Sequence, residues 1–204
     1  MIDRREILGS GAAALALGAL PAAAHKKADT VLDEELMPRV VNMQEFVPPG
    51  EIHVVPDEFA LYRTMPGSRA WRYSVGIGRP GLYEPGDFFV GAKKEWPSWT
   101  PTPEMIEREP EKYAQHEDGM PGGIDNPLGA RALYLFTPER GDTFLRVHGT
   151  NKPNTIGRAV SNGCARLVND QIIELYEHVP LKARVTLHEK GAIFPGYLEP
   201  AKTY

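Results

Sequence analysis

The sequence has a single cysteine, Cys164, in 204 residues, so the chain cannot form an internal disulfide bond. If the protein is exported, this lone thiol needs an explanation other than crosslinking. The six histidines show neither an HExxH sequence nor another paired-ligand spacing, so a metal site fits poorly. We therefore expect no cofactor.

An excess of positive charge is also missing, because the formal net charge is −4. The sequence offers no basic field for nucleic acid and no polybasic patch for a membrane surface. The apolar run over residues 7–24 is broken by three glycines and a proline, which makes it a poor membrane anchor. We expect no nucleic-acid partner and no stable membrane insertion after this run is removed.

Residues 1–24 have the organisation of a signal peptide. Arg4 and Arg5 precede an uncharged segment rich in alanine, leucine and glycine, which ends in three alanines before His25. The arginine pair before a moderately apolar segment resembles a twin-arginine signal, and an ordinary secretory signal is the alternative. We expect cleavage near Ala24 and a mature protein in the periplasm.

The 180 residues that remain of the 204 after residue 24 are enough for one domain with a core. Short β-type runs bounded by Gly, Pro or Asp predict a mainly β sandwich or barrel that carries one helix and one long irregular loop. A weak helical pattern falls between Val31 and Val41. The assigned segments are a linker or N-terminal edge segment (25–50), the main domain (51–192) and a C-terminal tail (193–204).

The one predicted helix covers residues 167–179, directly after Cys164. We expect Asn169 or Asp170 to cap its start and Pro180 to end it. Cys164 would then lie just upstream of the helix N-terminus. The positive potential there and the guanidinium group of Arg166 should both lower the pKa of the thiol.

Cys164 and His148 can form a nucleophile and its base. A free thiol is mostly protonated at neutral pH, so a catalytic cysteine needs a nearby base. The apolar run before His148 predicts a strand, and the polar loop that follows can bring the two side chains together. Gly163 would let backbone N–H groups converge on an oxyanion. The alternative is a small buried cysteine and a histidine without a catalytic role.

The segments HGTN (148–151), IGRAVSNGCARL (156–167) and ND (169–170) together resemble the signature of the L,D-transpeptidase family with the YkuD-type catalytic domain. The resemblance implies that Cys164 is the acyl-enzyme nucleophile and His148 its base. Ala165 departs from the signature, which more often has a branched aliphatic residue there. The WPSWTP and NPLGARAL segments are similar to family members too, so the resemblance extends over residues 51–192.

Other signature positions have supporting roles. Gly149, Ser161, Gly163 and Arg166 match the signature. We expect Ser161 to orient the loop or His148 by hydrogen bonding, and a backbone carbonyl at Gly149 to fix the imidazole tautomer. Arg166 either holds a carboxylate of the substrate or pairs with Asp170.

The irregular section over residues 96–126 breaks the β pattern, and loops of this length are usually functional or disordered. Trp96 and Trp99 stand among prolines in its first part. Their rings either form a wall of a binding cleft or pin the loop on the core.

The resemblance also implies a substrate, a peptidoglycan stem tetrapeptide cut before its terminal D-alanine. The acyl group would pass to an amine of another stem peptide, or to a lysine of an outer-membrane lipoprotein. With water as acceptor the same site would make an L,D-carboxypeptidase or endopeptidase. A noncatalytic wall-binding module is the remaining alternative.

Overall fold

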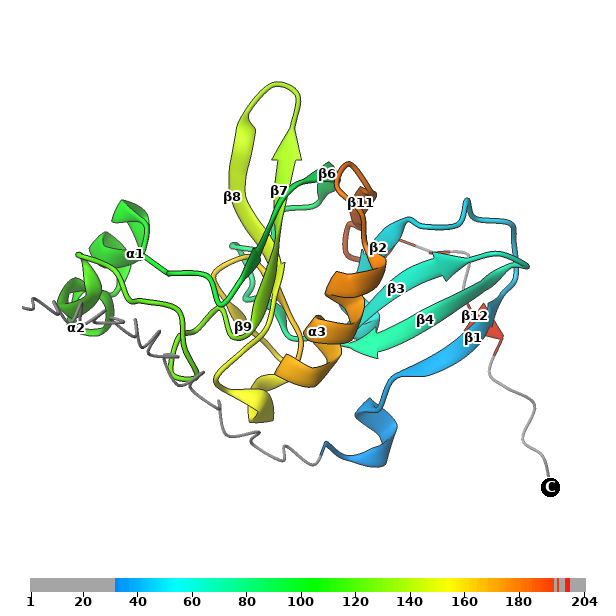
Figure 1. Ribbon diagram of the computed structural model, residues 1–204, viewed down its shortest axis with the longest axis horizontal. Helices are drawn as coiled ribbons and strands as arrows, with labels where there is room; N and C mark the ends of the chain where they lie inside the picture. Colours follow the sequence, from blue (N-terminus) through cyan, green and yellow to red (C-terminus); the bar gives the residue numbers. More distant parts are fainter. Residues whose placement is uncertain (1–31, 193, 195–196, 199–204) are drawn as a thin grey trace, which may run out of the picture.

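The computed structural model describes residues 32–192, 194 and 197–198 (Figure 1). The predicted signal peptide, residues 1–24, lies outside this range. The described strands are β1 (Arg39–Met43), β2 (Ile52–Val55), β3 (Ala60–Met65), β4 (Arg69–Ser74), β5 (Ile77–Gly78), β6 (Gly86–Glu95), β7 (Arg131–Thr137), β8 (Gly141–His148), β9 (Ala159–Ser161), β10 (Ala165–Arg166), β11 (Arg184–Leu187) and β12 (Tyr197–Leu198). The described helices are α1 (Pro103–Arg108), α2 (Pro110–Tyr113) and α3 (Asn169–His178), with 3-10 turns η1 (Glu34–Leu36), η2 (Pro56–Glu58), η3 (Ala114–His116) and η4 (Pro153–Thr155).

Ten strands form one sheet in the order β10-β8-β7-β6-β11-β2-β3-β4-β1-β12, and β5 pairs with β9 separately. Neighbours in the large sheet run antiparallel except β10 beside β8 and β11 beside β2. Figure 1 shows β7 and β8 as a long hairpin next to α3, with α1 and α2 at one end of the molecule and β1 at the other. The short strand β10 therefore ends the sheet at β8.

The middle of the sheet is buried on both faces. Ile52 and Leu61 belong to a large apolar cluster that α3 covers with Ile172, whereas Tyr62 belongs to a second cluster with Phe194. This division follows from the alternation of side chains along a strand. The prediction of a mainly β fold is confirmed.

The helix after Cys164 is present as α3, but its predicted cap is wrong. The N-cap residue is Val168, which makes no side-chain cap hydrogen bond. Asn169 is the first helical residue, and its Oδ1 accepts a hydrogen bond of 2.9 Å from the backbone N–H of Ala130. The side chain is thus committed to a neighbouring segment and not to its own helix. The helix ends at His178, shortly before Pro180.

The section over residues 96–126 is less irregular than expected, because it contains α1, α2 and η3. Pro103 and Pro110 stand in the first turns of α1 and α2. The backbone N–H that proline lacks would have no partner within the helix at these positions. The side chain of Thr102 caps α1 by accepting from the N–H of Met105 at 3.4 Å. The expectation of a single helix is therefore wrong. Prolines in a polar stretch are typical of a loop, but here they stand at the starts of two short helices.

Both ends of the described chain join the sheet. The helical pattern near Val41 is wrong for its second half, because β1 begins at Arg39 and pairs with β4. At the other end Phe194 is buried and β12 pairs with β1, so parts of the assigned tail belong to the fold. Within the described residues, no helix has the length and apolar character needed to cross a membrane.

Candidate active site

The pairing of β8 with β10 brings two of the candidate residues, His148 and Arg166, to one face of the sheet. Arg166 lies opposite His148, and Ala165 lies opposite Val147. Paired residues share a face and successive residues alternate. His148 and Arg166 are therefore on the face away from Val147 and Ala165, which are in the core. Cys164 directly precedes β10.

His148 is a buried, neutral imidazole. Its exposed fraction is 4%, and its Nδ1 lies 2.6 Å from the carbonyl oxygen of Gly149. Since a carbonyl can only accept, we assign the ring proton to Nδ1, which leaves the lone pair on Nε2. Burial, followed by the positive charge of Arg166, lowers the pKa of His148 to about 3. Nε2 is thus chemically able to accept a proton at neutral pH.

A close approach requires glycine at position 149. A Cβ there would lie 2.4 Å from Oδ1 of Asn169 and 3.0 Å from the backbone nitrogen of Ala130. These are the two atoms that form the Asn169 to Ala130 hydrogen bond. Asn169 therefore braces the backbone beside His148, a role that was not predicted, because nothing local in the sequence points to Ala130.

The thiol of Cys164 does not have the predicted lowered pKa. Its side chain is half-buried, and burial raises its pKa more than the Arg146 backbone N–H and the charges of Arg146 and Arg166 lower it. The reason is geometric: β10 stands between Cys164 and α3, and the field of a helix falls off within its first turn. Desolvation of the thiolate then dominates.

The thiol sulfur lies 4.0 Å from the carbonyl oxygen of Phe144 and makes that contact as a weak donor. Among the described residues, the structure records no hydrogen bond between this sulfur and the imidazole of His148. Catalytic hydrogen bonds are often long in an enzyme without substrate and tighten when substrate binds. The resting site therefore holds a protonated thiol and a neutral imidazole.

Ser161 and Gly163 shape the turn before Cys164. The buried hydroxyl of Ser161 donates to the carbonyl of Cys164 at 2.7 Å and accepts from the N–H of Gly163 at 3.3 Å. Gly163 has φ 124, and a Cβ there would lie 3.0 Å from both Leu145 Cδ2 and the carbonyl oxygen of Leu82. The structure thus places Ser161 on the loop and gives it no recorded contact with His148.

Arg166 has spare hydrogen-bond donors. Its Nε and Nη2 are buried without a hydrogen-bond partner in the described structure. Pairing of Arg166 with Asp170 stays the structural alternative. Its guanidinium lies over Gly76, where a Cβ would come within 2.8 Å of Nη2. Two unpaired donors on a planar fork suit a carboxylate.

The two tryptophans lie within their own loop. Trp96 has φ 41 and its N–H donates to the carbonyl of Ala130 at 2.8 Å. Trp99 pairs with Met120 through two backbone hydrogen bonds, and its ring packs against Tyr113 with centroids 6.2 Å apart. The Trp99 ring thus packs on a residue of the same loop, and both the cleft-wall role and the pinning of the loop on the core stay predictions.

Asn162 ties the nucleophile loop to the α1–α2 segment. Its Oδ1 accepts from Arg108 at 2.8 Å and from Arg79 at 3.3 Å, while its Nδ2 donates to the Tyr113 hydroxyl at 2.8 Å. Arg79 also pairs with Glu109. Sequence reasoning missed this network, because its members come from three separate segments.

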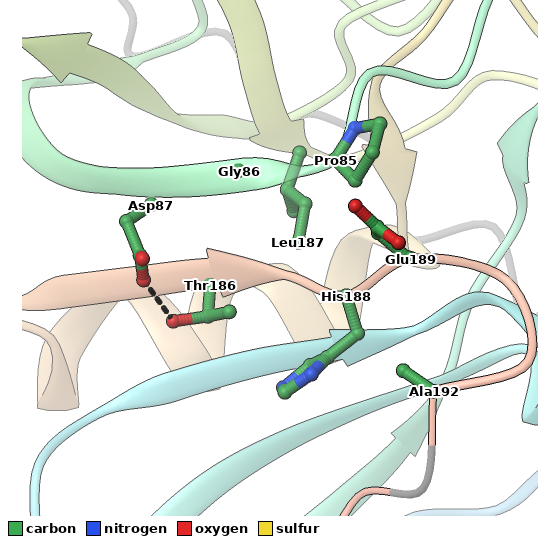
Figure 2. Close-up of a pocket in the computed structure, with 8 residues that line it drawn as sticks. All are labelled: Pro85, Gly86, Asp87, Thr186, Leu187, His188, Glu189 and Ala192. Carbon is green, nitrogen blue, oxygen red and sulfur yellow. Dashed lines mark hydrogen bonds between the residues drawn. The ribbon is translucent and has the colours of Figure 1, made fainter.

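A cavity of about 320 Å³ lies beside the paired strands β6 and β11 (Figure 2). It is lined by Pro85, Gly86, Asp87, Thr186, Leu187, His188, Glu189 and Ala192. None of these residues is among the candidate active-site residues. Over the described part of the chain, no group of three His, Cys, Asp or Glu side chains could hold a metal ion.

A family model and individual relatives among known proteins point to the same family. Residues 49–187 match the model of the YkuD family, described as the L,D-transpeptidase catalytic domain. A Fuscovulum blasticum protein named "Putative L,D-transpeptidase in ATP synthase subunits region ORF 5" is 34% identical over 85% of this chain and 94% of its own length. The Escherichia coli protein "Probable L,D-transpeptidase ErfK/SrfK" is 36% identical over 64% of this chain, which spans only 41% of that relative.

Solved structures agree on the fold. L,D-transpeptidase 3 from Mycobacterium tuberculosis aligns with a TM-score of 0.51 over 68% of this chain and 60% of its own, at 15% identity. A Brucella melitensis structure is 43% identical with a TM-score of 0.52, over 74% of this chain and 92% of that one. That structure is named as a probable carnitine operon oxidoreductase, a name that concerns that protein alone.

Proposed function

This chain belongs to the L,D-transpeptidase family, and from that premise we propose that it is a peptidoglycan L,D-transpeptidase with Cys164 as nucleophile and His148 as general base. The observation that carries the proposal is the register of β8 and β10. Arg166 lies opposite His148 in that register, Cys164 directly precedes β10, and the assigned tautomer of His148 has its lone pair on Nε2.

The first half-reaction forms a thioester. The sulfur of Cys164 attacks a carbonyl of the donor stem tetrapeptide while the thiol proton passes to Nε2 of His148. Backbone N–H groups around Gly163 and Cys164 stabilise the oxyanion. When the C–N bond breaks, the imidazolium of His148 gives its proton to the leaving amine of D-alanine.

Arg166 would hold the carboxylate of the leaving residue. In the register it lies opposite His148, which must protonate the amine of that same residue. Its two unpaired buried donors gain partners when the carboxylate binds. The amine and carboxylate of one D-alanine would thus meet two side chains that are neighbours across the strands.

The second half-reaction transfers the acyl group. An acceptor amine attacks the thioester, His148 takes a proton from it, and the thiol of Cys164 regains its proton as the C–S bond breaks. The acceptor we propose is the side-chain amine of another stem peptide or a lysine of an outer-membrane lipoprotein. Water in the acceptor position would give a carboxypeptidase or endopeptidase.

The experiment that tests the nucleophile is acylation of the full chain by a carbapenem, followed by intact mass measurement. We expect one adduct on wild type and none on Cys164→Ala. An adduct that persists without the thiol, or a wild type that forms none, would remove Cys164 from the mechanism. A noncatalytic wall-binding module would give the second result.

Product analysis separates transfer from hydrolysis. With purified tetrapeptide fragments, transfer gives a dimer in which the third-residue carbonyl of the donor is joined to a side-chain amine of the acceptor, with release of D-alanine. Shortened monomer alone, even at high acceptor concentration, would show that water is the acceptor. Cys164→Ala is the control for both products.

We also propose that the protein acts in the periplasm, on the basis of its family and of Arg4 and Arg5. The double substitution Arg4→Lys with Arg5→Lys should leave precursor in the cytoplasm if export uses the twin-arginine route. Normal export of that variant would indicate the general secretory route.

A further inference from the structure

Strand β8 has a bulge in its pairing with β7, next to the nucleophile. Tyr134 pairs with Arg146 and Phe136 with Asp142, so three residues of β8, 143–145, stand opposite a single residue of β7. Phe144 is at the centre of this bulge with φ 61, a left-handed conformation that strains a bulky side chain. Strain of this kind persists where surrounding contacts hold it, and it gathers at functional sites.

Side chains on both flanks hold the bulge in place. The carboxylate of Asp142 accepts from the N–H of Phe144 at 2.9 Å and takes two hydrogen bonds from Arg146, at 2.7 and 2.9 Å. On the other strand, the carbonyl of Leu135 accepts from the hydroxyl of Thr143 at 2.7 Å. The conformation of Phe144 is therefore fixed by its neighbours and not by its own preference.

The ring of Phe144 is exposed, and the backbone of the same residue lies beside the reacting sulfur. Its exposed fraction is 69%, although its carbonyl oxygen lies 4.0 Å from Sγ of Cys164. The guanidinium of Arg146 lies 4.0 Å from the centre of the Tyr134 ring and 5.8 Å from that of Phe144. A large apolar ring thus stands in water at the rim of the site.

Phe144 and Arg166 lie toward different ends of the site. Arg166 lies opposite His148, at the end of β8, whereas Phe144 lies four residues earlier in that strand. Cys164 directly precedes β10, and its sulfur lies 4.0 Å from the carbonyl oxygen of Phe144. A donor whose leaving residue meets Arg166 would therefore extend its acyl part along β8 in the direction of Phe144.

We propose that Phe144 is a specificity-determining residue for the acyl donor. Its ring packs against the aliphatic side chain of the donor residue whose carbonyl Cys164 attacks, a long diamino acid chain with several methylenes. This inference rests on the function proposed above. The bulge keeps the ring at the rim, where that contact removes apolar surface of both partners from water.

Phe144→Gly is the variant that isolates the ring. Glycine adopts positive φ without strain, so the bulge should remain and the stability should not fall. The matched control is Phe46→Gly, which removes an equally exposed ring (75%) in the connection between β1 and β2, away from β8 and β10 in the strand order. Alkylation of Cys164 by iodoacetamide should proceed at the wild-type rate in both variants.

The test compares two donors, a tetrapeptide with a diamino acid at its third residue and the same peptide with alanine there. Wild type and Phe46→Gly should acylate from the first donor roughly tenfold or more faster in kcat/KM, mainly through KM. Phe144→Gly should lose that preference and keep its rate with the alanine donor. A Phe144→Gly variant that discriminates as well as wild type would overturn the inference. A wild type that acylates from neither donor would instead refute the proposed function.

Discussion

His148→Asn should change acid stability and acylation together. In the fold the pKa of His148 is about 3, against an ordinary value near 6.5, because the side chain is buried beside Arg166. A group with a lowered folded pKa binds protons mainly in the unfolded chain. Its contribution to stability is therefore complete above about pH 6.5 and declines as the pH falls from 6.5 toward 3.

The expected size follows from the shift. Within that window each pH unit costs about 1.4 kcal/mol per histidine, so His148 should remove about 2 kcal/mol of stability between pH 6.5 and 5. Burial and the charge on His188 lower the pKa of His53 to about 4, so His53 should remove a similar amount. We expect wild type to lose about 2 kcal/mol more than His148→Asn, or about 4–8 °C in Tm.

The assay is urea unfolding at pH 7, 6 and 5, together with the rate of carbapenem acylation at pH 7. Asparagine can still donate to the carbonyl of Gly149, so the variant should fold, but acylation should fall roughly 100-fold. His178→Asn, at an exposed position of α3, is the matched control. Equal acid sensitivity in His148→Asn and wild type would mean that His148 is not held neutral by burial. Equal acylation would remove it as the base.

Substitutions at two further positions test the surroundings of the site. Asn169→Ala leaves the N–H of Ala130 without its partner, so urea unfolding should show a loss of about 1–3 kcal/mol, and an unchanged stability would mean that Asn169 is no brace. Arg166→Gln should lower kcat/KM roughly tenfold or more for a tetrapeptide donor with a free terminal carboxylate, and little for the terminal carboxamide. Arg166→Lys should recover only part of the loss because lysine lacks the planar fork, and equal losses with both donors would assign Arg166 a structural role.

Features that depend on neighbouring residues along the chain could be predicted from the sequence. The β runs and the α3 stripe were readable because alternation and helical spacing are local, and the motif around Cys164 and His148 is long enough to identify a family. The cap of α3 could not be predicted, because the side chain of Asn169 accepts a hydrogen bond from Ala130, 39 positions away in the sequence. Nor was the bulge at Phe144, since that conformation opposes the preference of phenylalanine and depends on contacts with β7 and Asp142.

The charge state of the site was the least predictable property, and it bears on how the reaction begins. Burial raises the pKa of Cys164 and lowers that of His148, so both shifts disfavour a thiolate and imidazolium pair before substrate arrives. The charge of Arg166 lowers both pKa values, because it favours the thiolate and opposes the imidazolium. A donor carboxylate that neutralises Arg166 would therefore make His148 a stronger base and the thiol of Cys164 a weaker acid. A site of this kind keeps its thiol protonated in the absence of substrate, which slows oxidation of the thiol because the thiolate is the reactive form.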